Sequence, residues 1–405
     1  MLGHLHRRII LPPSVEASSP NGKTIGAKTG AGFRSRSEKV FHRSPMQVQQ
    51  QRHESGKKIR NNNIISPSTM NPQLANFILE KTPDFILHPK TMSDTEFTLN
   101  TGAKIPALGL GTWQSAPGEV KNAVSHALKV GYKHIDAAYV YGNEDEVGEG
   151  LAEGFKSGIK REDVFLWCTY HSRVEENLDL SLKSLGLDYV DLYLMHWPVP
   201  MNPKGNDPKF PKHPDGSRDL DTTWSYTQTW KEMEAVLATG KTRAIGVANF
   251  SVPFLEELMK EAKVTPAANQ IENHPYLPQQ EIVDYCKDKG ILITAYSPLG
   301  STGSPLFQEK EIQEVAKKHD VSPGTVLLSY HVARGSSVIP KSVTPSRIEE
   351  NMKLIKLDSG DVKALDNIAK THPPNRFVSI SDSLISNRLC EDFDGPDDGE
   401  AMDRV

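Results

Sequence analysis

The sequence is short of cysteine. Cys168, Cys286 and Cys390 are the only cysteines among 405 residues, and their spacing fits neither a disulfide framework nor a metal-binding motif. Disulfide frameworks are typical of secreted proteins, so this scarcity favours a reducing compartment. We therefore expect a cytoplasmic protein that binds no metal ion.

Long apolar runs are also missing. No stretch approaches the roughly 20 apolar residues that a membrane helix requires, so we expect a soluble protein without a membrane partner. No GxGxxG motif follows an early strand-like run either. This second absence argues against a doubly wound dinucleotide-binding sheet.

The first 91 residues contain few acidic and few apolar side chains. They hold 14 Lys and Arg against 5 Asp and Glu, whereas the rest of the chain holds 33 against 46. Such a segment cannot bury enough apolar surface to offset its chain entropy, so we expect a disordered basic extension. Its first fifteen residues, with two Arg and no acid, faintly resemble a mitochondrial transit peptide, which makes mitochondria the alternative location. No interleaved aromatic residues accompany the basic ones, so we expect no nucleic-acid partner.

From residue 92 onward, strand-like and helix-like stretches take turns. Residues 95–106 alternate in polarity around a turn at 100–102, which predicts a β-hairpin. A short apolar strand then ends at Gly111, and seven more are expected at about 134–138, 163–169, 189–195, 243–248, 267–272, 292–296 and 336–341. Each precedes a stretch of helical periodicity, such as 117–130. This order predicts an α/β fold of the (β/α)8 TIM barrel type, with the hairpin closing the barrel floor.

Polar residues fall at the predicted strand ends. Asp136 ends one strand and Tyr141 follows five residues later, so a carboxylate and a phenol lie close enough to handle a proton, with Tyr141 as the acid. The structural alternative is that Asp136 caps the next helix and Tyr141 packs on it. Residues 198–223 show no periodicity and are long for an internal connection, which is typical of a functional loop.

Four motifs resemble the aldo-keto reductase family, and within it the fungal glycerol dehydrogenases and glyceraldehyde reductases. They are GYKHIDAAYVYGNEDEVG at 131–148, DYVDLYLMHWPV at 188–199, PAANQIEN at 266–273 and IPKSVTPSRIEEN at 339–351. The resemblance covers roughly residues 92–377, which leaves 1–91 as the extension and 378–405 as an atypical acidic tail. It implies NADP(H)-dependent reduction of small aldehydes or ketoses, with polyol oxidation in reverse, and we expect a monomer.

The resemblance also implies roles for individual residues. Three members of the family's Tyr, His, Lys and Asp tetrad match, namely Tyr141, His196 and Asp136. Trp113, Trp167 and Trp197 would form apolar walls of the substrate pocket, together with the loop at 198–223, although plain packing at the barrel mouth is the alternative for each tryptophan.

The cofactor half of the site would combine charge, amides and an aromatic ring. The resemblance implies that Lys341, Ser342 and Arg347 hold the 2′-phosphate, and basic residues at a helix start favour a phosphate on physical grounds as well. The alternative is a merely basic helix start capped by Thr344. Tyr296 would stack on the nicotinamide, and Asn249 and Gln270 would bind its carboxamide. The further contacts are Thr112, Trp113, Ser297, Leu299, Ser301, Thr344, Glu350 and Asn351.

The tetrad lysine is missing. The family's third strand ends in Lys before Leu-Trp, whereas this chain passes from Phe165 directly to Leu166 and has no Lys between Lys160 and Lys183. The strand has two solutions. Anchored at its start, it places Thr169 at the lysine position. Anchored at its end, it places Phe165 there and pulls 158–163 into the sheet, and we favour this second solution.

The missing lysine has a chemical consequence. Without a nearby ammonium, the pKa of Tyr141 would drift back toward that of a free phenol. Two explanations fit this break and the altered sequence after Val378: misplaced exon boundaries, or true divergence. The second would give a catalytically impaired barrel that still binds NADP(H).

Overall fold

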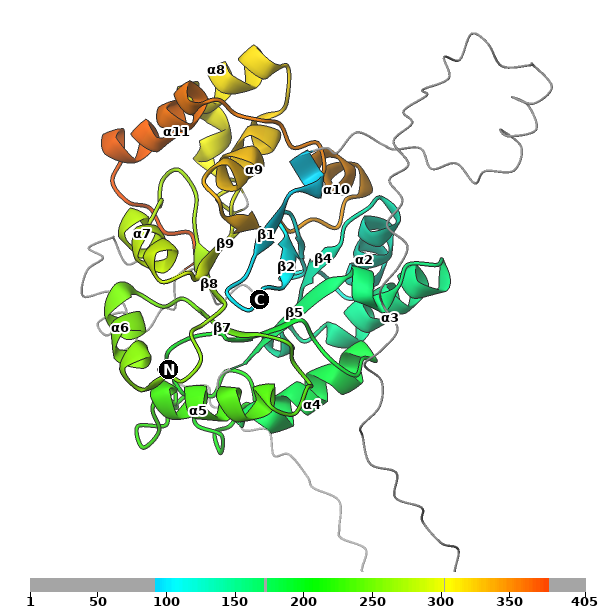
Figure 1. Ribbon diagram of the computed structural model, residues 1–405, viewed down its shortest axis with the longest axis vertical. Coiled ribbons are helices and arrows are strands. Elements are labelled where there is room, and N and C mark those ends of the chain that lie inside the picture. The colour runs from blue at the N-terminus through cyan, green and yellow to red at the C-terminus, as the bar shows by residue number, and fades with distance from the viewer. Residues whose placement is uncertain (1–91, 171–172, 302, 379–405) are drawn as a thin grey trace, which may run out of the picture. The chain divides into compact units, whose positions relative to one another are not determined.

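The computed structural model describes residues 92–170, 173–301 and 303–378 (Figure 1). The predictions for the basic extension and for the tail after Val378 lie outside the described residues. A 3-10 turn, η2 (Met92–Asp94), opens the described part and leads into an antiparallel hairpin of β1 (Glu96–Thr98) and β2 (Lys104–Pro106). Leu99 and Ile105 of this hairpin are buried against residues at the strand starts, which confirms that the hairpin closes the barrel floor.

Eight parallel strands form one sheet in sequential order. They are β3 (Leu110–Gly111), β4 (His134–Asp136), β5 (Phe165–Tyr170), β6 (Leu192–Met195), β7 (Ile245–Ala248), β8 (Ala268–Glu272), β9 (Leu292–Tyr296) and β10 (Ser337–Val338). Parallel bridges from Leu108 to Val338 and from Gly111 to Lys341 join the first strand to the last. Because these bridges close the sheet on itself, the (β/α)8 barrel predicted from the sequence is confirmed.

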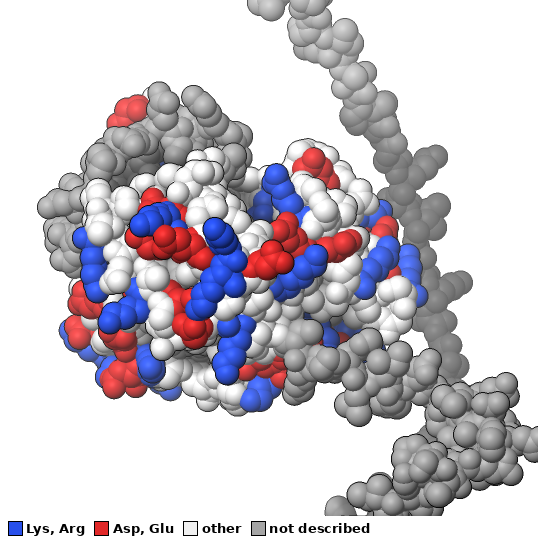
Figure 2. Space-filling view, turned by 90° about the horizontal axis from the view of Figure 1, so that it is seen from above, with Lys and Arg blue, Asp and Glu red and all other residues white. Residues whose placement is uncertain are grey.

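Helices surround this sheet (Figure 1). They are α2 (Val120–Lys129), α3 (Glu144–Lys156), α4 (Val174–Leu185), α5 (Tyr226–Leu237), α6 (Val252–Glu261), α7 (Gln280–Asp288), α8 (Lys310–His319), α9 (Pro323–Ala333), α10 (Pro345–Asn351) and α11 (Ser359–Thr371). Within the described ranges, no helix combines the length and the apolar character needed to cross a membrane. On the face shown in Figure 2, acidic and basic side chains are interspersed, so no field of one sign covers it.

The favoured register for β5 was wrong. Phe165 pairs with His134 and Trp167 with Asp136, so the strand is anchored at its start and includes residues up to Tyr170. Two contacts explain this choice. Phe165 is buried in the barrel floor with its ring 5.4 Å from that of His134. The preceding 3-10 turn, η4 (Arg161–Asp163), is held outside the sheet because Arg161 pairs with Asp191 at 2.9 Å.

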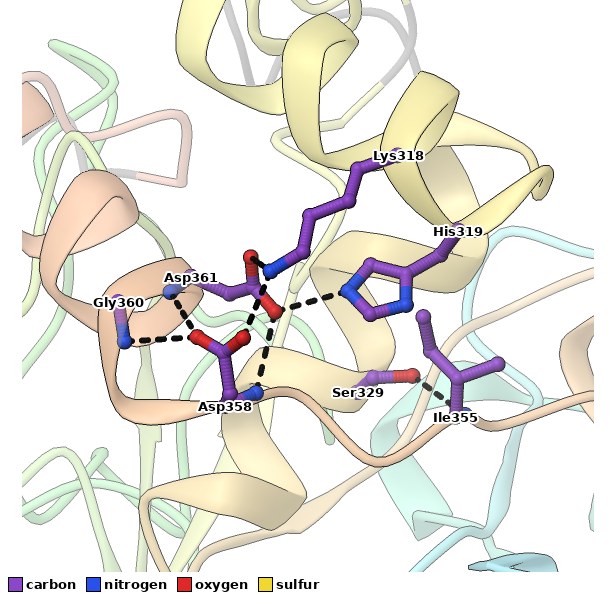
Figure 3. Close-up of polar contacts among 7 residues, drawn as sticks. All are labelled: Lys318, His319, Ser329, Ile355, Asp358, Gly360 and Asp361. Atoms are coloured by element: carbon purple, nitrogen blue, oxygen red, sulfur yellow. Dashed lines mark hydrogen bonds and ion pairs between the residues drawn. The ribbon is translucent and has the colours of Figure 1, made fainter.

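A polar cluster joins α8 to α11 (Figure 3). Asp358 caps α11 by accepting from the backbone N–H groups of Gly360 and Asp361 at 2.8 and 2.9 Å. The carboxylate of Asp361 accepts from Lys318 at 2.7 Å and contacts the His319 ring nitrogen at 2.8 Å. The end of α8 is thereby tied to the first turn of the last described helix.

Candidate active site

A cavity of about 1130 Å³ opens at the carboxyl ends of the barrel strands. Parallel strands deliver their C-terminal residues to the same end of a barrel, which is why residues far apart in the sequence meet here. The predicted site residues that line it are Trp113, Asp136, Tyr141, His196, Trp197, Asn249, Gln270, Tyr296, Ser297, Leu299, Ser301, Lys341, Ser342, Arg347, Glu350 and Asn351. Thr112 and Thr344 are not among the lining residues, and the prediction for the Trp167 side chain lies outside what the structure describes.

Asp136 is a buried carboxylate at the end of β4. Only 3% of its surface is exposed, and Gln270 donates to its Oδ1 at 3.3 Å. The Thr112 hydroxyl donates to the Asp136 backbone carbonyl at 2.8 Å, and Asn143 donates to the carbonyl of Thr112 at 3.0 Å. Thr112 therefore supports the site from beneath the cavity, and the Gln270 amide is directed at the carboxylate.

Tyr141 and His196 face each other across the cavity. Tyr141 ends the 3-10 turn η3 (Tyr139–Tyr141), which Gly142 closes in a left-handed conformation with φ 70°. The two rings meet edge to face with centroids 6.0 Å apart. Burial raises the pKa of the Tyr141 phenol well above its usual 10, and the Asp136 carboxylate and Tyr296 raise it further. Burial lowers the pKa of His196 to about 4. At neutral pH the site therefore presents a protonated phenol and a neutral imidazole.

Hydrogen bonds link the amide and aromatic residues of the cavity wall. The Tyr296 hydroxyl donates to Asn249 Oδ1 at 2.9 Å, and Asn249 Nδ2 donates to the His196 carbonyl at 2.9 Å. Asn249, Ser297 and Ser301 have positive φ values of 63°, 47° and 63°. Left-handed backbone is uncommon outside glycine and gathers at functional sites. Of these three residues, Asn249 is held in its left-handed conformation by the two hydrogen bonds of its side chain.

One end of the cavity is basic. Lys341, Ser342 and Arg347 line it, followed by Glu350 and Asn351 from α10. The Lys341 ammonium donates to the Gln114 carbonyl at 2.9 Å, and burial lowers its pKa. Because α10 has only seven residues, we take the charged side chains beside it as the main attraction for an anion. Thr344 is the N-cap of α10 and Pro345 follows it, but the Thr344 side chain makes no capping bond.

Several parts of the cavity wall escaped the residue-level prediction, among them part of the loop at 198–223, Val378, Phe307 and Ser322. The loop at 198–223 contributes Met201, Phe210, Lys212 and Arg218; the sequence marked the loop as a whole as a wall of the pocket but none of these four residues. Val378 lines the cavity as well. Its backbone N–H and that of Phe377 donate to the fully buried Glu272 carboxylate at 3.0 and 2.7 Å, which fixes this edge of the cavity.

Comparisons with known proteins agree with this geometry. Residues 107–370 match the model of the "Aldo/keto reductase family". The chain is 61% identical over 280 residues to a D-galacturonate reductase of Hypocrea jecorina. This match covers 68% of this chain and 91% of that protein. It is 50% identical over 303 residues to a glycerol 2-dehydrogenase (NADP(+)) of Saccharomyces cerevisiae, and this match covers 72% of this chain and 96% of that protein. The structure of an aldose reductase from Schistosoma japonicum superposes with a TM-score of 0.67 at 37% sequence identity. The superposition covers 72% of this chain and 96% of the other chain. A barrel with this cavity and these relatives belongs to the aldo/keto reductase family, and the chain is an oxidoreductase of that family.

Proposed function

We propose that the protein reduces small aldehydes and ketoses to alcohols with NADPH, and oxidises glycerol or other polyols in reverse. The supporting observation is that one cavity joins the Tyr141 and His196 rings to the basic group of Lys341, Ser342 and Arg347. The first can deliver a proton, and the second can hold an anionic cofactor. The names of the two sequence relatives, a uronate reductase and a glycerol dehydrogenase, point to polyhydroxylated substrates.

The residues present fit NADP(H). Lys341 is a cation drawn into the cavity wall, and Ser342 and Arg347 beside it would complete a site for the 2′-phosphate. Glu350 and Asn351 would hold the adenine. The remaining contacts would come from Tyr296 on the nicotinamide face, Asn249 and Gln270 on the carboxamide, and Ser297, Leu299 and Ser301 along the pyrophosphate. When bound, NADPH supplies the hydride that the carbonyl carbon accepts.

Tyr141 and His196 would act on the carbonyl oxygen. As the carbon gains a hydride, negative charge develops on the oxygen, and donors aimed at it lower the barrier. The neutral His196 imidazole donates a hydrogen bond that orients the carbonyl, and the Tyr141 phenol transfers its proton to the oxygen, which gives the alcohol. Trp113 and Trp197 form apolar walls that exclude water from this step.

A second candidate function rests on the missing lysine. All three influences on the Tyr141 phenol, namely burial, Asp136 and Tyr296, raise its pKa. In the reverse reaction Tyr141 must be a phenolate that accepts the alcohol proton, and a raised pKa makes this phenolate scarce; even the forward step gains from a stabilised phenolate. The alternative is therefore a barrel that binds NADP(H) but turns over slowly.

Two assays on the same protein separate these candidates. NADPH consumption with DL-glyceraldehyde measures turnover, and quenching of protein fluorescence by NADPH measures binding. If the protein is an active reductase, both NADPH consumption and fluorescence quenching should be seen. The Tyr141→Phe variant should lose turnover and keep NADPH binding. Binding without turnover in the unaltered chain supports the second candidate, and absence of NADPH binding contradicts both.

A further inference from the structure

The loop at 198–223 is braced by its own backbone. Antiparallel bridges join Met201 to Leu220 and Lys212 to Arg218. Backbone hydrogen bonds of 2.8 and 2.9 Å flank the second bridge on its two sides. Because the loop is held together in this way, a contact at one of its residues positions the residues beside it as well.

Lys209 brings this loop against η3, the turn that ends in Tyr141. Its ammonium lies 5.6 Å from the centre of the Tyr139 ring, within the range of a cation–π contact. A Cβ atom at Gly142, which closes the turn, would lie only 2.5 Å from this ammonium. The glycine therefore leaves open the space that the ammonium occupies, and a positive charge from the loop rests on the catalytic turn.

A buried carboxylate follows the same turn. Glu144 is the first residue of α3 and only 4% exposed, and its Oε1 has no hydrogen-bond partner among the described residues. Burial raises the pKa of Glu144 to about 7; the Ser181 hydroxyl of α4 and the Lys209 ammonium lower it, and the Asp145 carboxylate on the same helix raises it. Of the two charges that act on Glu144, Lys209 is the one that stabilises its ionised form.

Lys209 is coupled to the cavity wall through its neighbour Phe210. Asp207 Oδ1 accepts from the backbone N–H groups of both residues, each at 2.7 Å, so their backbone forms one unit. Phe210 lines the cavity but is 41% exposed, so burial of its ring alone contributes little to its position. The position of Phe210 at the wall thus depends on where Lys209 is held.

We propose that Lys209 and Glu144 form an electrostatic anchor that fixes the loop at 198–223 to η3, so that both are positioning residues for the cavity wall at Phe210. This inference rests on the proposed reductase function, in which that wall encloses the substrate. The attraction is effective because the carboxylate is withdrawn from water, where charges are screened less than at an exposed site. Without the anchor the wall would be mobile, and substrate would bind more weakly while the chemical step stays the same.

Steady-state kinetics with DL-glyceraldehyde at pH 8 test the anchor. Lys209→Met should raise KM about three- to tenfold, as the loss of one partly buried charge contact allows, and leave kcat and Kd for NADPH within about twofold. Glu144→Gln should have the same effect, and the double variant should be no worse than either single one, because both remove one interaction. Lys209→Arg, which keeps the cation, should regain part of the loss. Lys204→Met, at an exposed lysine of the same loop, is the matched control.

The pH dependence of KM separates this anchor from a merely structural role. As the pH falls from about 8 to 6, Glu144 takes up a proton because its pKa is about 7. KM of the unaltered chain should therefore rise about three- to tenfold over this range while kcat stays level. Glu144→Gln and Lys209→Met should show the higher KM at both pH values. A KM that changes with pH equally in the unaltered chain and in both variants would overturn the anchor.

Hydrogen exchange of the backbone amides in residues 198–223 tests the anchor without turnover. At pH 8 these amides should exchange faster in Lys209→Met and Glu144→Gln than in the unaltered chain and Lys204→Met. Faster exchange in a protein that does not reduce the aldehyde upholds the anchor and contradicts the proposed function. Turnover with KM and loop exchange unchanged in both variants overturns the anchor alone. A lower kcat with unchanged loop exchange assigns the two charges to the chemistry of Tyr141 and also overturns it.

Discussion

The Tyr141 phenol holds its proton tightly, and this sets the expected pH dependence. Its pKa is raised well above 10 by burial, Asp136 and Tyr296, so the phenol is protonated throughout the usual assay range. We expect kcat for reduction to stay level between about pH 5 and 9, since the pKa of His196, lowered to about 4, adds no change above that value. In the oxidation direction, where the phenol must first lose its proton, kcat should rise about tenfold per pH unit. A reduction rate that falls between about pH 7 and 9 would mean that a cation lowers the phenol pKa.

Arg347 is expected to decide the choice of cofactor. It lines the basic end of the cavity with Lys341 and Ser342. A charge-assisted hydrogen bond to a phosphate contributes about 1.5–3 kcal/mol, so Arg347→Ala should raise Kd for NADPH about tenfold or more and change Kd for NADH little. Fluorescence titration with both cofactors measures this. Lys353→Ala, at an exposed lysine just beyond α10, serves as the control, and equal loss of both cofactors would refute the phosphate assignment.

At the scale of the elements, β5 decides where a lysine must be restored. Thr169 pairs with Leu194 of β6. In this register, in which the strand is anchored at its start, Thr169 occupies the position expected for the family's lysine. Thr169→Lys, and separately the insertion of four residues ending in Lys between Phe165 and Leu166, should raise turnover by orders of magnitude because an ammonium near Tyr141 lowers its pKa. NADPH affinity should change little.

The matched controls place Met where each variant has Lys. Initial rates with DL-glyceraldehyde and fluorescence titration with NADPH provide the two measurements. If neither lysine variant is faster than its methionine control, the missing lysine does not limit this protein.

The contacts between α8 and α11 should make the stability of the fold sensitive to low pH. Burial pushes the pKa of Asp361 up, but bonds to Lys318 and His319 outweigh it and hold the pKa below its usual value. Lys318 likewise lowers the pKa of Asp358 to about 2. A depressed carboxylate pKa stabilises the fold at neutral pH, and this contribution is lost as the pH falls below about 4.

Asp361→Asn should therefore lower Tm at pH 7 and weaken the dependence of Tm on pH between about 4 and 2. The expected loss at neutral pH is about 1–3 kcal/mol, as for a buried carboxylate deprived of charged partners. Glu314→Gln is the control, because the Glu314 pair with Lys310 is exposed at 3.7 Å and such pairs contribute about 0–1 kcal/mol. Thermal melts across this pH range test the prediction, and parallel curves for Asp361→Asn and the unaltered chain would contradict it.

At the scale of the whole molecule, the barrel is complete from Met92 onward. Met92 packs against the main core, and Ala107, just past the hairpin, donates its N–H to Thr95 at 2.8 Å. We expect a chain starting at Met92 to melt at the same temperature as the full chain, because every strand and the hairpin that closes the floor are retained. Calorimetry of both chains measures this. A drop of several degrees would mean that residues before Met92 contribute to the stability of the barrel.

The sequence alone determined the barrel and about half of the cavity-lining residues. Strand runs separated by helical periodicity are local patterns, and a parallel barrel brings every strand's carboxyl end to one face. For that reason the sequence was sufficient to group Asp136, Tyr141 and His196 at one end of the barrel. The absence of a lysine between Lys160 and Lys183 was equally plain from the sequence.

Only the tertiary structure decided the features that depend on long-range pairing. The register of β5 follows from the burial of Phe165 in the floor and from the bond between Arg161 and Asp191, neither of which leaves a periodic signal. The opposition of Lys212 and Arg218 follows from backbone bonds inside a loop with no pattern of its own. Local alternation determines which residues reach a strand end, because this pattern depends only on residues that are adjacent in the sequence. Which residues face one another across strands and loops is decided by packing between segments far apart in the chain.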